Sequence, residues 1–235
     1  IRKAAGVPLR ASIASIISVR IKECIVGQSV IIVDYEAGNL GSVYRACEAV
    51  GLNARVSSDP SVIAGADRVI FPGVGTAESA MVTLNRLGLD EALLKFAQSD
   101  RPLLGICLGL QILLDHTEEG DRRCLGLIPG QCRRFDFEEV ELKVPQIGWN
   151  AVQPCQDHSI QKGIPTGAEF YFVHGYYAAP TEASHVIAHT TYGDRTFASV
   201  IGRDNLFATQ FHLEKSGRFG LELLAAFGGW DGVGC

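Results

Sequence analysis

The sequence predicts an α/β fold: a single three-layer domain with a largely parallel, flavodoxin-like sheet, mixed at one edge, and helices on both faces. Between residues 29 and 114, short apolar runs alternate with segments of helical spacing, which is typical of parallel strands joined by helices. The later half contains several strands in succession, as in hairpins, and this predicts the mixed edge. Chemistry in such a fold lies at the carboxyl ends of the strands.

The first half supplies the parallel part of the sheet. A continuous apolar run at 30–33 predicts a strand buried on both faces. Asn39 is a plausible N-cap for a helix over 40–50, whose apolar positions recur every three or four residues until Gly51 closes it. Short strands follow at 54–56 and 68–71. Two helices fill 76–98, broken near Gly88, and a buried strand at 102–106 leads into a helix that runs through residue 114.

The second half supplies the mixed part. We expect strands at 140–144, 170–173, 185–192, 198–201 and 206–211. A closing helix at 217–227 places Leu221, Leu224 and Phe227 on one face.

Composition favours a small-molecule or protein partner. Of 235 residues, 47% are hydrophobic and 20% charged, which is enough apolar material for a core. The net charge of −5 gives no field that attracts nucleic acid or anionic lipid, so we expect neither as a partner. Seven cysteines at irregular spacing, with no C-x-x-C pair, predict free thiols in a reducing compartment and no metal site.

Residues 1–28 differ in kind from the rest. They are basic, contain serines and have almost no acids, as an organelle transit segment does. The alternative is a disordered or helical extension, or translated upstream sequence. We therefore divide the chain into an N-terminal extension at 1–28, disordered or targeting, and one domain at 29–235. The expected location is the cytoplasm, or a plastid if 1–28 is a transit segment.

The strongest chemical signal is the segment Gly105-Ile106-Cys107-Leu108-Gly109, which lies where a buried strand turns into a helix. A nucleophile elbow requires this arrangement, because the sharp turn lifts the reactive side chain into a cleft and the glycines let the backbone pass closely. The helix N-terminus favours a thiolate over a thiol. The alternative is an ordinary small buried cysteine.

A base for such a nucleophile is present about a hundred residues later. His212 and Glu214 stand two apart, and in extended chain such residues share a face. Glu214 can then hold one ring nitrogen of His212 while the other meets the thiol, which is the logic of a catalytic triad. Taken alone, His212 would be an ordinary hydrogen-bonded histidine.

A third segment, Pro72-Gly73-Val74-Gly75, follows a strand and precedes a helix. The glycines free backbone N–H groups to point at a developing oxyanion, and the amide of Leu108 can supply another donor. The same residues could form an ordinary turn. A phosphate loop is disfavoured, since no Lys follows.

Together these segments resemble the class I glutamine amidotransferases, and more narrowly the glutaminase subunits of imidazole glycerol phosphate synthase. The resemblance covers roughly residues 29–227, and its motifs arrive in family order. The residues that carry it are Asp34-Tyr35-Glu36-Ala37-Gly38-Asn39-Leu40-Gly41-Ser42-Val43, the 72–75 loop, the 105–111 elbow, Gly148-Trp149-Asn150, Tyr171-Phe172-Val173-His174 and Gln210-Phe211-His212-Leu213-Glu214-Lys215-Ser216.

The resemblance implies a glutamine amidohydrolase that needs no cofactor. Cys107 would form a glutamyl thioester, with His212 and Glu214 completing the triad, Gly73, Val74, Gly75 and Leu108 serving the oxyanion, and Gln111 binding glutamine. The family's partner is a (β/α)8-barrel cyclase, with which it forms a heterodimer. Ammonia crosses into the barrel for synthesis of imidazole glycerol phosphate and aminoimidazole carboxamide ribotide in histidine biosynthesis.

The resemblance also implies control by the partner and a contact surface for it. Trp149, Asn150 and Lys215 match positions near the partner interface. Members of the family are largely idle until the partner binds its own substrate, and the oxyanion loop is the part thought to rearrange.

The chain departs from the family pattern at two places. Leu213 stands where the family has Pro, and Gln146-Ile147 stand where it has His-Met. Leu213 leaves open a non-catalytic subunit that only binds or regulates a partner, and Gln146-Ile147 alter contacts near the interface. A sibling amidotransferase, a γ-glutamyl hydrolase and a redox sensor are further alternatives.

Overall fold

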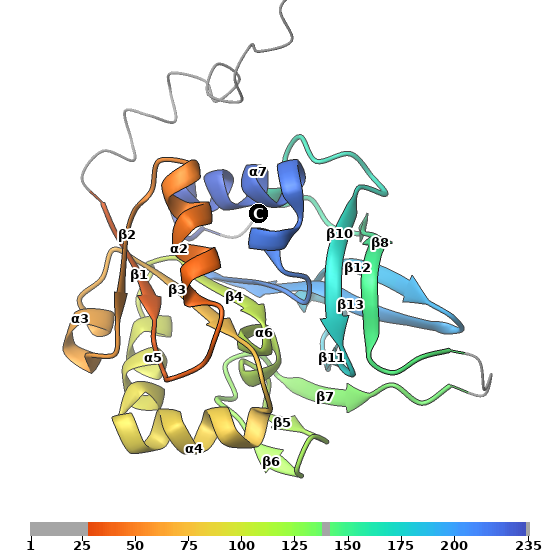
Figure 1. Cartoon of the computed structure of the whole chain (residues 1–235), viewed down its shortest axis with the longest axis horizontal. Coiled ribbons are helices and arrows are strands. Elements are labelled where there is room, and N and C mark those ends of the chain that lie inside the picture. The colour runs from red at the N-terminus through yellow and green to blue at the C-terminus, as the bar shows by residue number, and fades with distance from the viewer. Residues whose placement is uncertain (1–27, 138–141, 234–235) are drawn as a thin grey trace, which may run out of the picture.

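The parallel half of the sheet lies at one side of the molecule (Figure 1). The structure is a computed structural model, and it describes residues 28–137 and 142–233. Its parallel strands pair in the order β2-β1-β3-β4-β14, which is the flavodoxin-like order that the sequence predicts. They are β1 (Ser29–Val33), β2 (Asn53–Ser57), β3 (Arg68–Gly73), β4 (Leu103–Cys107) and β14 (Leu206–Thr209).

Beyond β14 the sheet becomes mixed. β13 pairs antiparallel with β14, and the sheet continues through β11, β7, β5 and β6. β12 pairs with β13, and β9 pairs with β12. These strands are β5 (His116–Thr117), β6 (Arg122–Arg123), β7 (Gly130–Arg134), β9 (Gln153–Pro154), β11 (Tyr176–Pro180), β12 (Val186–Tyr192) and β13 (Arg195–Arg203). A separate antiparallel pair is formed by β8 (Gln146–Ala151) and β10 (Glu169–His174). The predicted fold class is confirmed, although the mixed part extends well beyond one edge strand.

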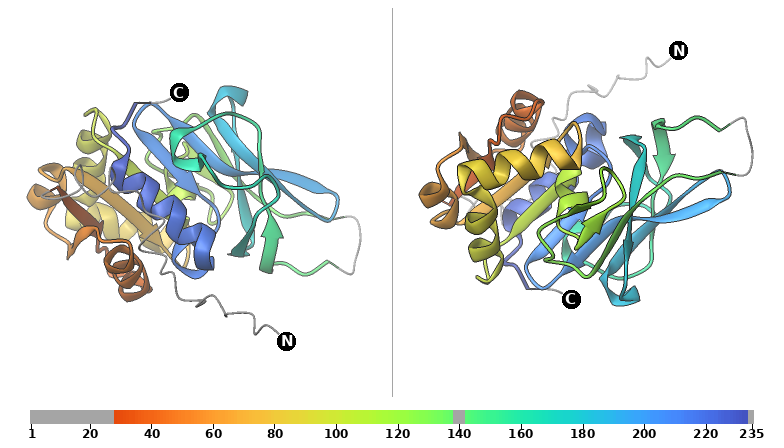
Figure 2. Two further views of the ribbon diagram at one scale, coloured as in Figure 1. Left: turned by 90° about the horizontal axis from the view of Figure 1, so that it is seen from above. Right: turned by 90° about the horizontal axis from the view of Figure 1, so that it is seen from below.

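Helices cover both faces of the parallel strands, as Figure 2 shows from two sides. On β1, Val30 and Ile32 pack with the helices of one face, whereas Ile31 and Val33 pack with those of the other. The first face carries α2 (Leu40–Ala49) and α7 (Gly217–Gly229), and the second carries α3 (Pro60–Ala64), α4 (Ala77–Leu87), α5 (Leu89–Ala97) and α6 (Leu108–Ile112). Both faces of each central strand are buried, which explains the continuous apolar runs.

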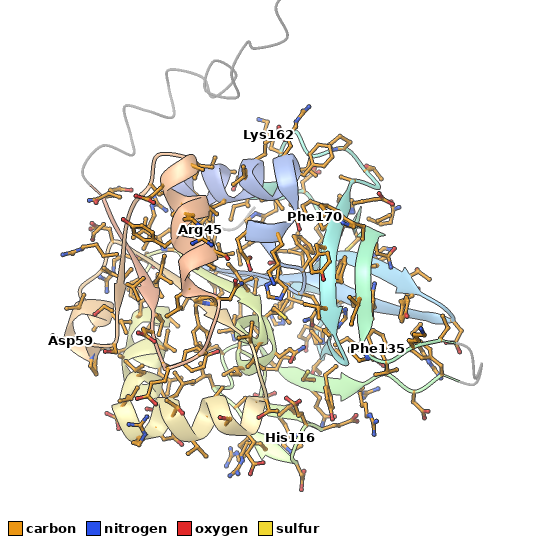
Figure 3. All side chains as sticks on the ribbon, viewed as in Figure 1. Arg45, Asp59, His116, Phe135, Lys162 and Phe170 are labelled. Carbon is orange, nitrogen blue, oxygen red and sulfur yellow. The ribbon has the colours of Figure 1, made fainter. Side chains whose placement is uncertain are left out.

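Aromatic packing joins the β8–β10 pair to the domain. Phe170 of β10 stacks on Phe211, with ring centroids 4.2 Å apart. Figure 3 shows Phe170 between β10 and α7. Phe172 meets Phe211 edge-on at 5.5 Å, so the segment just after β14 is held by buried rings. That segment leads into η4 (Leu213–Lys215), a single 3-10 turn; two more such turns are η2 (Ser159–Gln161) and η3 (Ala183–His185).

One predicted strand is wrong. Residues 140 and 141 of the expected strand at 140–144 lie outside the described residues, and residues 142–144 do not form a strand. The strand in this region, β8, begins at Gln146, just after Pro145. Proline has no N–H to donate to a ladder, so the apolar residues before it do not pair.

Several predicted boundaries also shift. The strand expected at 206–211 ends at Thr209. His185, expected to begin a strand, closes the η3 turn instead, and the helix expected through residue 114 ends at Ile112. The sequence patterns do not predict α3, β7 or β11, because each is short and lacks a clear period.

In the part of the chain that the structure describes, no helix has both the length and the apolar character needed to cross a membrane. The expected extension at 1–28 lies outside the described residues, except for residue 28.

Candidate active site

Cys107 is the last residue of β4, and α6 begins immediately after it. Its backbone has φ 55° and ψ −107°, a conformation that side chains rarely adopt and that marks a sharp strand-to-helix turn. A side chain at Gly109 would collide with the carbonyl oxygen of Phe71, and one at Gly105 would lie 2.9 Å from Cβ of Ala208. The two glycines therefore allow the turn, in the geometry that a nucleophile elbow requires.

His212 and Glu214 are joined by a buried hydrogen bond. Nδ1 of His212 lies 2.7 Å from Oε1 of Glu214, and both side chains are almost fully buried. The prediction that they share a face of extended chain is wrong. Glu214 lies within the η4 turn, and the turn itself brings the carboxylate back to the ring. Leu213, where the family has Pro, is buried in the core and leaves this contact intact.

Asn39 contacts the same carboxylate oxygen as His212 does. Its side-chain amide donates to Oε1 of Glu214. The sequence favours Asn39 as an N-cap, but its side chain makes no cap hydrogen bond and its backbone is left-handed, with φ 75°. A polar residue just past the carboxyl end of β1 is the signal that could have assigned it to the site.

The electrostatics of His212 favour its charged form. Burial alone would lower the pKa of the ring, but the neighbouring Cys107 and Glu214 outweigh burial and raise the pKa well above its usual value. Nε2 of His212 is buried and has no hydrogen-bond partner in the described residues. An imidazolium beside the Cys107 sulfur favours a thiolate.

A cavity of about 270 Å³ unites the predicted residues. Its lining includes Cys107, His212, Gln111, Val74 and Gly75, together with Leu108. Gly73 does not line the cavity, but a side chain there would lie 2.8 Å from Cβ of Leu108. Residue 73 must therefore be glycine for the 72–75 loop to lie against the elbow.

Gln111 lines the cavity, and its side-chain NH2 is bonded to the protein. Its Nε2 donates to the carbonyl oxygen of Tyr176 at 2.9 Å and to Oε1 of Gln210 at 3.3 Å. With both N–H groups engaged, Oε1 of Gln111 is the atom left to bind a ligand.

Gln210 is a site residue that the sequence patterns do not identify. Its side chain is fully buried, and its Nε2 donates to Sγ of Cys107 at 3.8 Å. A glutamine in a run of apolar strand residues, two positions before a candidate base, is the signal that could have found it.

The residues predicted near a partner interface lie on the β8–β10 pair and η4. Trp149 is 54% exposed, and its ring meets Tyr171 edge-on at 6.2 Å. The ammonium of Lys215 lies 5.9 Å from the Tyr171 ring. Asn150 instead donates to the carbonyl oxygen of Thr191, so its side chain is tied to β12. We call the exposed Ile147, Trp149 and Lys215, together with the half-buried Tyr171, the β8–β10 face.

Gln146, the other departure from the family pattern, is buried next to the cavity. Its side-chain amide lies 3.0 Å from Nε2 of His174, and Nδ1 of His174 lies 2.7 Å from the carbonyl oxygen of Tyr176. Burial lowers the pKa of His174 to about 4, so the ring is neutral and has one N–H. Because the Tyr176 carbonyl only accepts, that proton is on Nδ1. Nε2 is then an acceptor facing Oε1 of Gln146, and a hydrogen bond between them requires the side-chain amide of Gln146 to be turned so that its NH2 faces the ring.

The fold and this site define an α/β enzyme class with a thiol beside a histidine–carboxylate pair. The sequence profile described as Glutamine amidotransferase class-I matches residues 31–228. The chain therefore belongs to the class I glutamine amidotransferase family, and it is an enzyme of that class.

The relatives narrow the resemblance to one subunit. The chain is 50% identical over 208 residues to the imidazole glycerol phosphate synthase subunit HisH of Nitrosococcus oceani, covering 87% of this chain and 99% of that protein. The subunit HisH of Chromobacterium violaceum is 45% identical over 210 residues, covering 86% and 98%. These matches confirm the narrower resemblance that the motifs indicate.

Solved structures agree on the fold. PurLQS from Thermotoga maritima superposes with a TM-score of 0.63 at 15% identity, covering 85% of this chain and 97% of that chain. The glutaminase domain of Trypanosoma brucei CTPS, with bound acivicin, gives 0.56 at 15% identity, covering 85% and 93%. At this identity the likeness extends to the fold alone.

Proposed function

We propose that the chain is the glutaminase subunit of imidazole glycerol phosphate synthase and hydrolyses glutamine with Cys107, His212 and Glu214. The observation that carries this proposal is the single cavity lined by Cys107, His212 and Gln111, beside a His212–Glu214 hydrogen bond of 2.7 Å. The near end-to-end match to HisH subunits supports the choice of subunit.

The first half of the reaction releases ammonia. With the proton of Cys107 already held on Nε2 of His212, the thiolate sulfur attacks the side-chain amide carbon of glutamine. The carbonyl oxygen becomes an oxyanion, and His212 then passes the proton to the amide nitrogen. The carbon–nitrogen bond breaks, ammonia leaves, and a glutamyl thioester remains on Cys107.

The second half restores the thiol. A water molecule gives a proton to His212 and attacks the thioester carbon, and the carbon–sulfur bond breaks. The sulfur recovers its proton from His212, and glutamate leaves. Throughout, Glu214 fixes the ring and stabilises the imidazolium, while Asn39 fixes Glu214.

In this proposal, backbone N–H groups of the 72–75 loop and of Leu108 donate hydrogen bonds to the oxyanion. Val74, Gly75 and Leu108 line the cavity beside Cys107. One well-placed backbone donor stabilises such a transition state by roughly 3–4 kcal/mol. Gln111 orients the substrate through its free oxygen.

The β8–β10 face is the proposed docking surface for a (β/α)8-barrel cyclase in a heterodimer. β10 and the residue before β8 line the cavity through Val173, His174 and Pro145, and the same strands carry the exposed Ile147 and Trp149. Ammonia would cross this interface to form imidazole glycerol phosphate and aminoimidazole carboxamide ribotide. The expected compartment is the cytoplasm, with a plastid as the alternative.

Glutamate release by the purified chain tests the proposal, measured alone and with the cyclase subunit plus its ribonucleotide ligand. We expect low activity alone, a large rise with the partner, and loss of all activity in Cys107→Ala. Partner-independent hydrolysis that needs Cys107 would keep the chemistry and overturn the control by the partner. A confirmed complex with no activity would favour the non-catalytic subunit and direct attention to Leu213.

A further inference from the structure

A chain of buried amides leads to the candidate nucleophile. The carbonyl oxygen of Tyr176 accepts from Gln111, Gln111 donates to Gln210, and Gln210 donates to Cys107, at 2.9, 3.3 and 3.8 Å in turn. Gln111 is 5% exposed and Gln210 is fully buried. The backbone of Gln210 is fixed too, since its N–H donates to the carbonyl oxygen of Ser199 at 2.9 Å.

The direction of this chain is set by its first member. A backbone carbonyl only accepts, so the group of Gln111 that faces Tyr176 must be its NH2. The second N–H of Gln111 then requires an acceptor, which orients Gln210 with its oxygen toward Gln111. The NH2 of Gln210 is left facing Sγ of Cys107, so the chain delivers a donor to the sulfur.

We propose that Gln210 is a positioning residue of the glutaminase reaction, whose side-chain N–H stabilises Cys107 as a thiolate and holds it toward the substrate. This inference rests on the proposed function, because it gives Cys107 the role of nucleophile. A contact of 3.8 Å is weak for a neutral thiol and strengthens when the sulfur is charged, since hydrogen bonds to ionised groups are shorter and stronger. Gln210 therefore favours the reactive form over the resting thiol.

Several titratable groups surround the sulfur, and all of them remain in the variants below. They are His212 and Glu214 at η4, Tyr35 after β1, His174 at the end of β10, Cys132 on β7 and Glu119 on the cavity wall. A change confined to residue 210 thus isolates the amide donor.

The test is the rate of alkylation of Cys107 by iodoacetamide as a function of pH, followed by mass spectrometry of the peptide that contains Cys107. Gln210→Met keeps the length of the side chain and removes its polar groups. We expect the plot of alkylation rate against pH for Gln210→Met to move to higher pH by about one unit. Where the rate rises with pH, the variant should therefore react about tenfold more slowly, and at high pH the two rates should be equal. Gln210→Glu keeps an acceptor for Gln111 but puts a carboxylate beside the sulfur, and its profile should move further.

Ser199→Ala is the matched control, because Ser199 is equally buried, contacts Gln210 through its backbone, and has a hydroxyl with no partner in the described residues. Its profile should coincide with that of the unchanged protein. The proposal would be overturned if the alkylation profiles of Gln210→Met and Gln210→Glu both coincided with that of the unchanged protein. Alkylation needs neither glutamine nor the partner, so it tests the role of Gln210 separately from glutaminase activity. The proposed function itself would be overturned by a different result, which is full glutaminase activity in Cys107→Ala.

Discussion

At the scale of single residues, Tyr35 is one of the site residues with a buried polar atom that has no partner among the described residues. Its hydroxyl is buried and has no hydrogen-bond partner among the described residues, although it lies against Gly73. Burial and the charge of the neighbouring Cys107 raise the pKa of the phenol, while the Val74 amide opposes the rise. The ring itself packs on Phe71, with centroids 5.5 Å apart.

Replacing Tyr35 with Phe should therefore not destabilise the protein. The change keeps the ring and removes a desolvated hydroxyl, so we expect the free energy of unfolding to stay the same or rise by up to about 1 kcal/mol. Tyr192→Phe is the control, since it removes a hydrogen bond of 2.9 Å to the carbonyl oxygen of Lys143 and should cost about 1 kcal/mol. Urea denaturation measures both, and a larger loss in Tyr35→Phe would show that the hydroxyl is satisfied.

The His212–Glu214 pair makes a second residue-scale prediction, on pH. The folded-state pKa of His212 is raised to about 10, against about 6.5 in the unfolded chain. The stability contributed by its charged form is complete below pH 6.5 and is lost as pH rises toward 10.

Glu214→Gln should weaken this effect by removing one of the groups that raise the pKa. Between pH 7 and 10, the free energy of unfolding should fall less steeply with pH in Glu214→Gln than in the unchanged protein. The two slopes should differ by at most about 1.4 kcal/mol per pH unit. Urea denaturation at several pH values measures this. Equal slopes of unfolding free energy against pH in the two proteins would contradict the statement that Glu214 raises the pKa of His212.

At the scale of elements, the η4 turn shows why Leu213 replaces the family's Pro without breaking the site. Residue 213 begins a 3-10 turn, whose usual φ suits proline, and His212 before it is extended, with φ −85° and ψ 103°. In the described residues the N–H of Leu213 has no hydrogen-bond partner. A proline would therefore lose no hydrogen bond here.

We expect Leu213→Pro to keep partner-dependent glutaminase activity within about threefold and to change the free energy of unfolding by less than about 1.5 kcal/mol. Leu213→Ala is the comparison, because it empties a buried site and should cost about 2–4 kcal/mol. Thermal unfolding and activity with the cyclase check both. An inactive but folded Leu213→Pro would mean that the turn has a different backbone.

Elements also show where sequence reasoning succeeds. The strand ending at Cys107 and the helix after it followed from apolar runs, glycines and spacing, which are local signals. The contact between Asn39 and Glu214 joins residues far apart in the chain, and no periodicity encodes it. The strand expected before Pro145 is wrong, since β8 begins only at Gln146. Apolar character alone does not predict a strand next to a proline, which has no N–H to donate.

At the scale of the whole molecule, the surface proposed for the cyclase carries an exposed tryptophan. Trp149 is 54% exposed on β8, and Val82 on α4 is equally exposed. The sequence indicated Trp149 only through family resemblance, because exposure depends on the tertiary arrangement.

Trp149→Ala should raise the dissociation constant for the cyclase subunit at least about tenfold, since exposed tryptophans are frequent anchors of interfaces. Val82→Ala should leave it unchanged, because α4 lies on the second face of the sheet, away from β8. Titration calorimetry of the two variants distinguishes an anchor from a general effect of exposure. Unchanged binding in Trp149→Ala would place the interface elsewhere.

The molecule should also be sensitive to acid through His158. Burial lowers its folded-state pKa to about 4, so the unfolded chain binds more protons between pH 4 and 6.5 and stability is lost as pH falls through that range. His158→Asn keeps an acceptor for the N–H of Ile160 and does not titrate. Its loss of unfolding free energy between pH 6.5 and 4 should be smaller than in the unchanged protein.

Phe207→Leu is the control for that experiment, because Phe207 packs on His158 at 4.8 Å and carries no proton. It should lower stability equally at both pH values. An identical pH dependence in His158→Asn would show that other groups determine the acid response.

The position of β14 has a consequence for synthesis. This strand follows β4 by about a hundred residues in the sequence, yet it pairs with β4 on one side and β13 on the other, in the middle of the sheet. A nascent chain that has emerged only as far as residue 205 contains Cys107 but neither β14 nor His212. The ribosome must therefore extend the chain beyond residue 212 before Cys107 can meet His212, and translation products that stop earlier would lack the proposed triad.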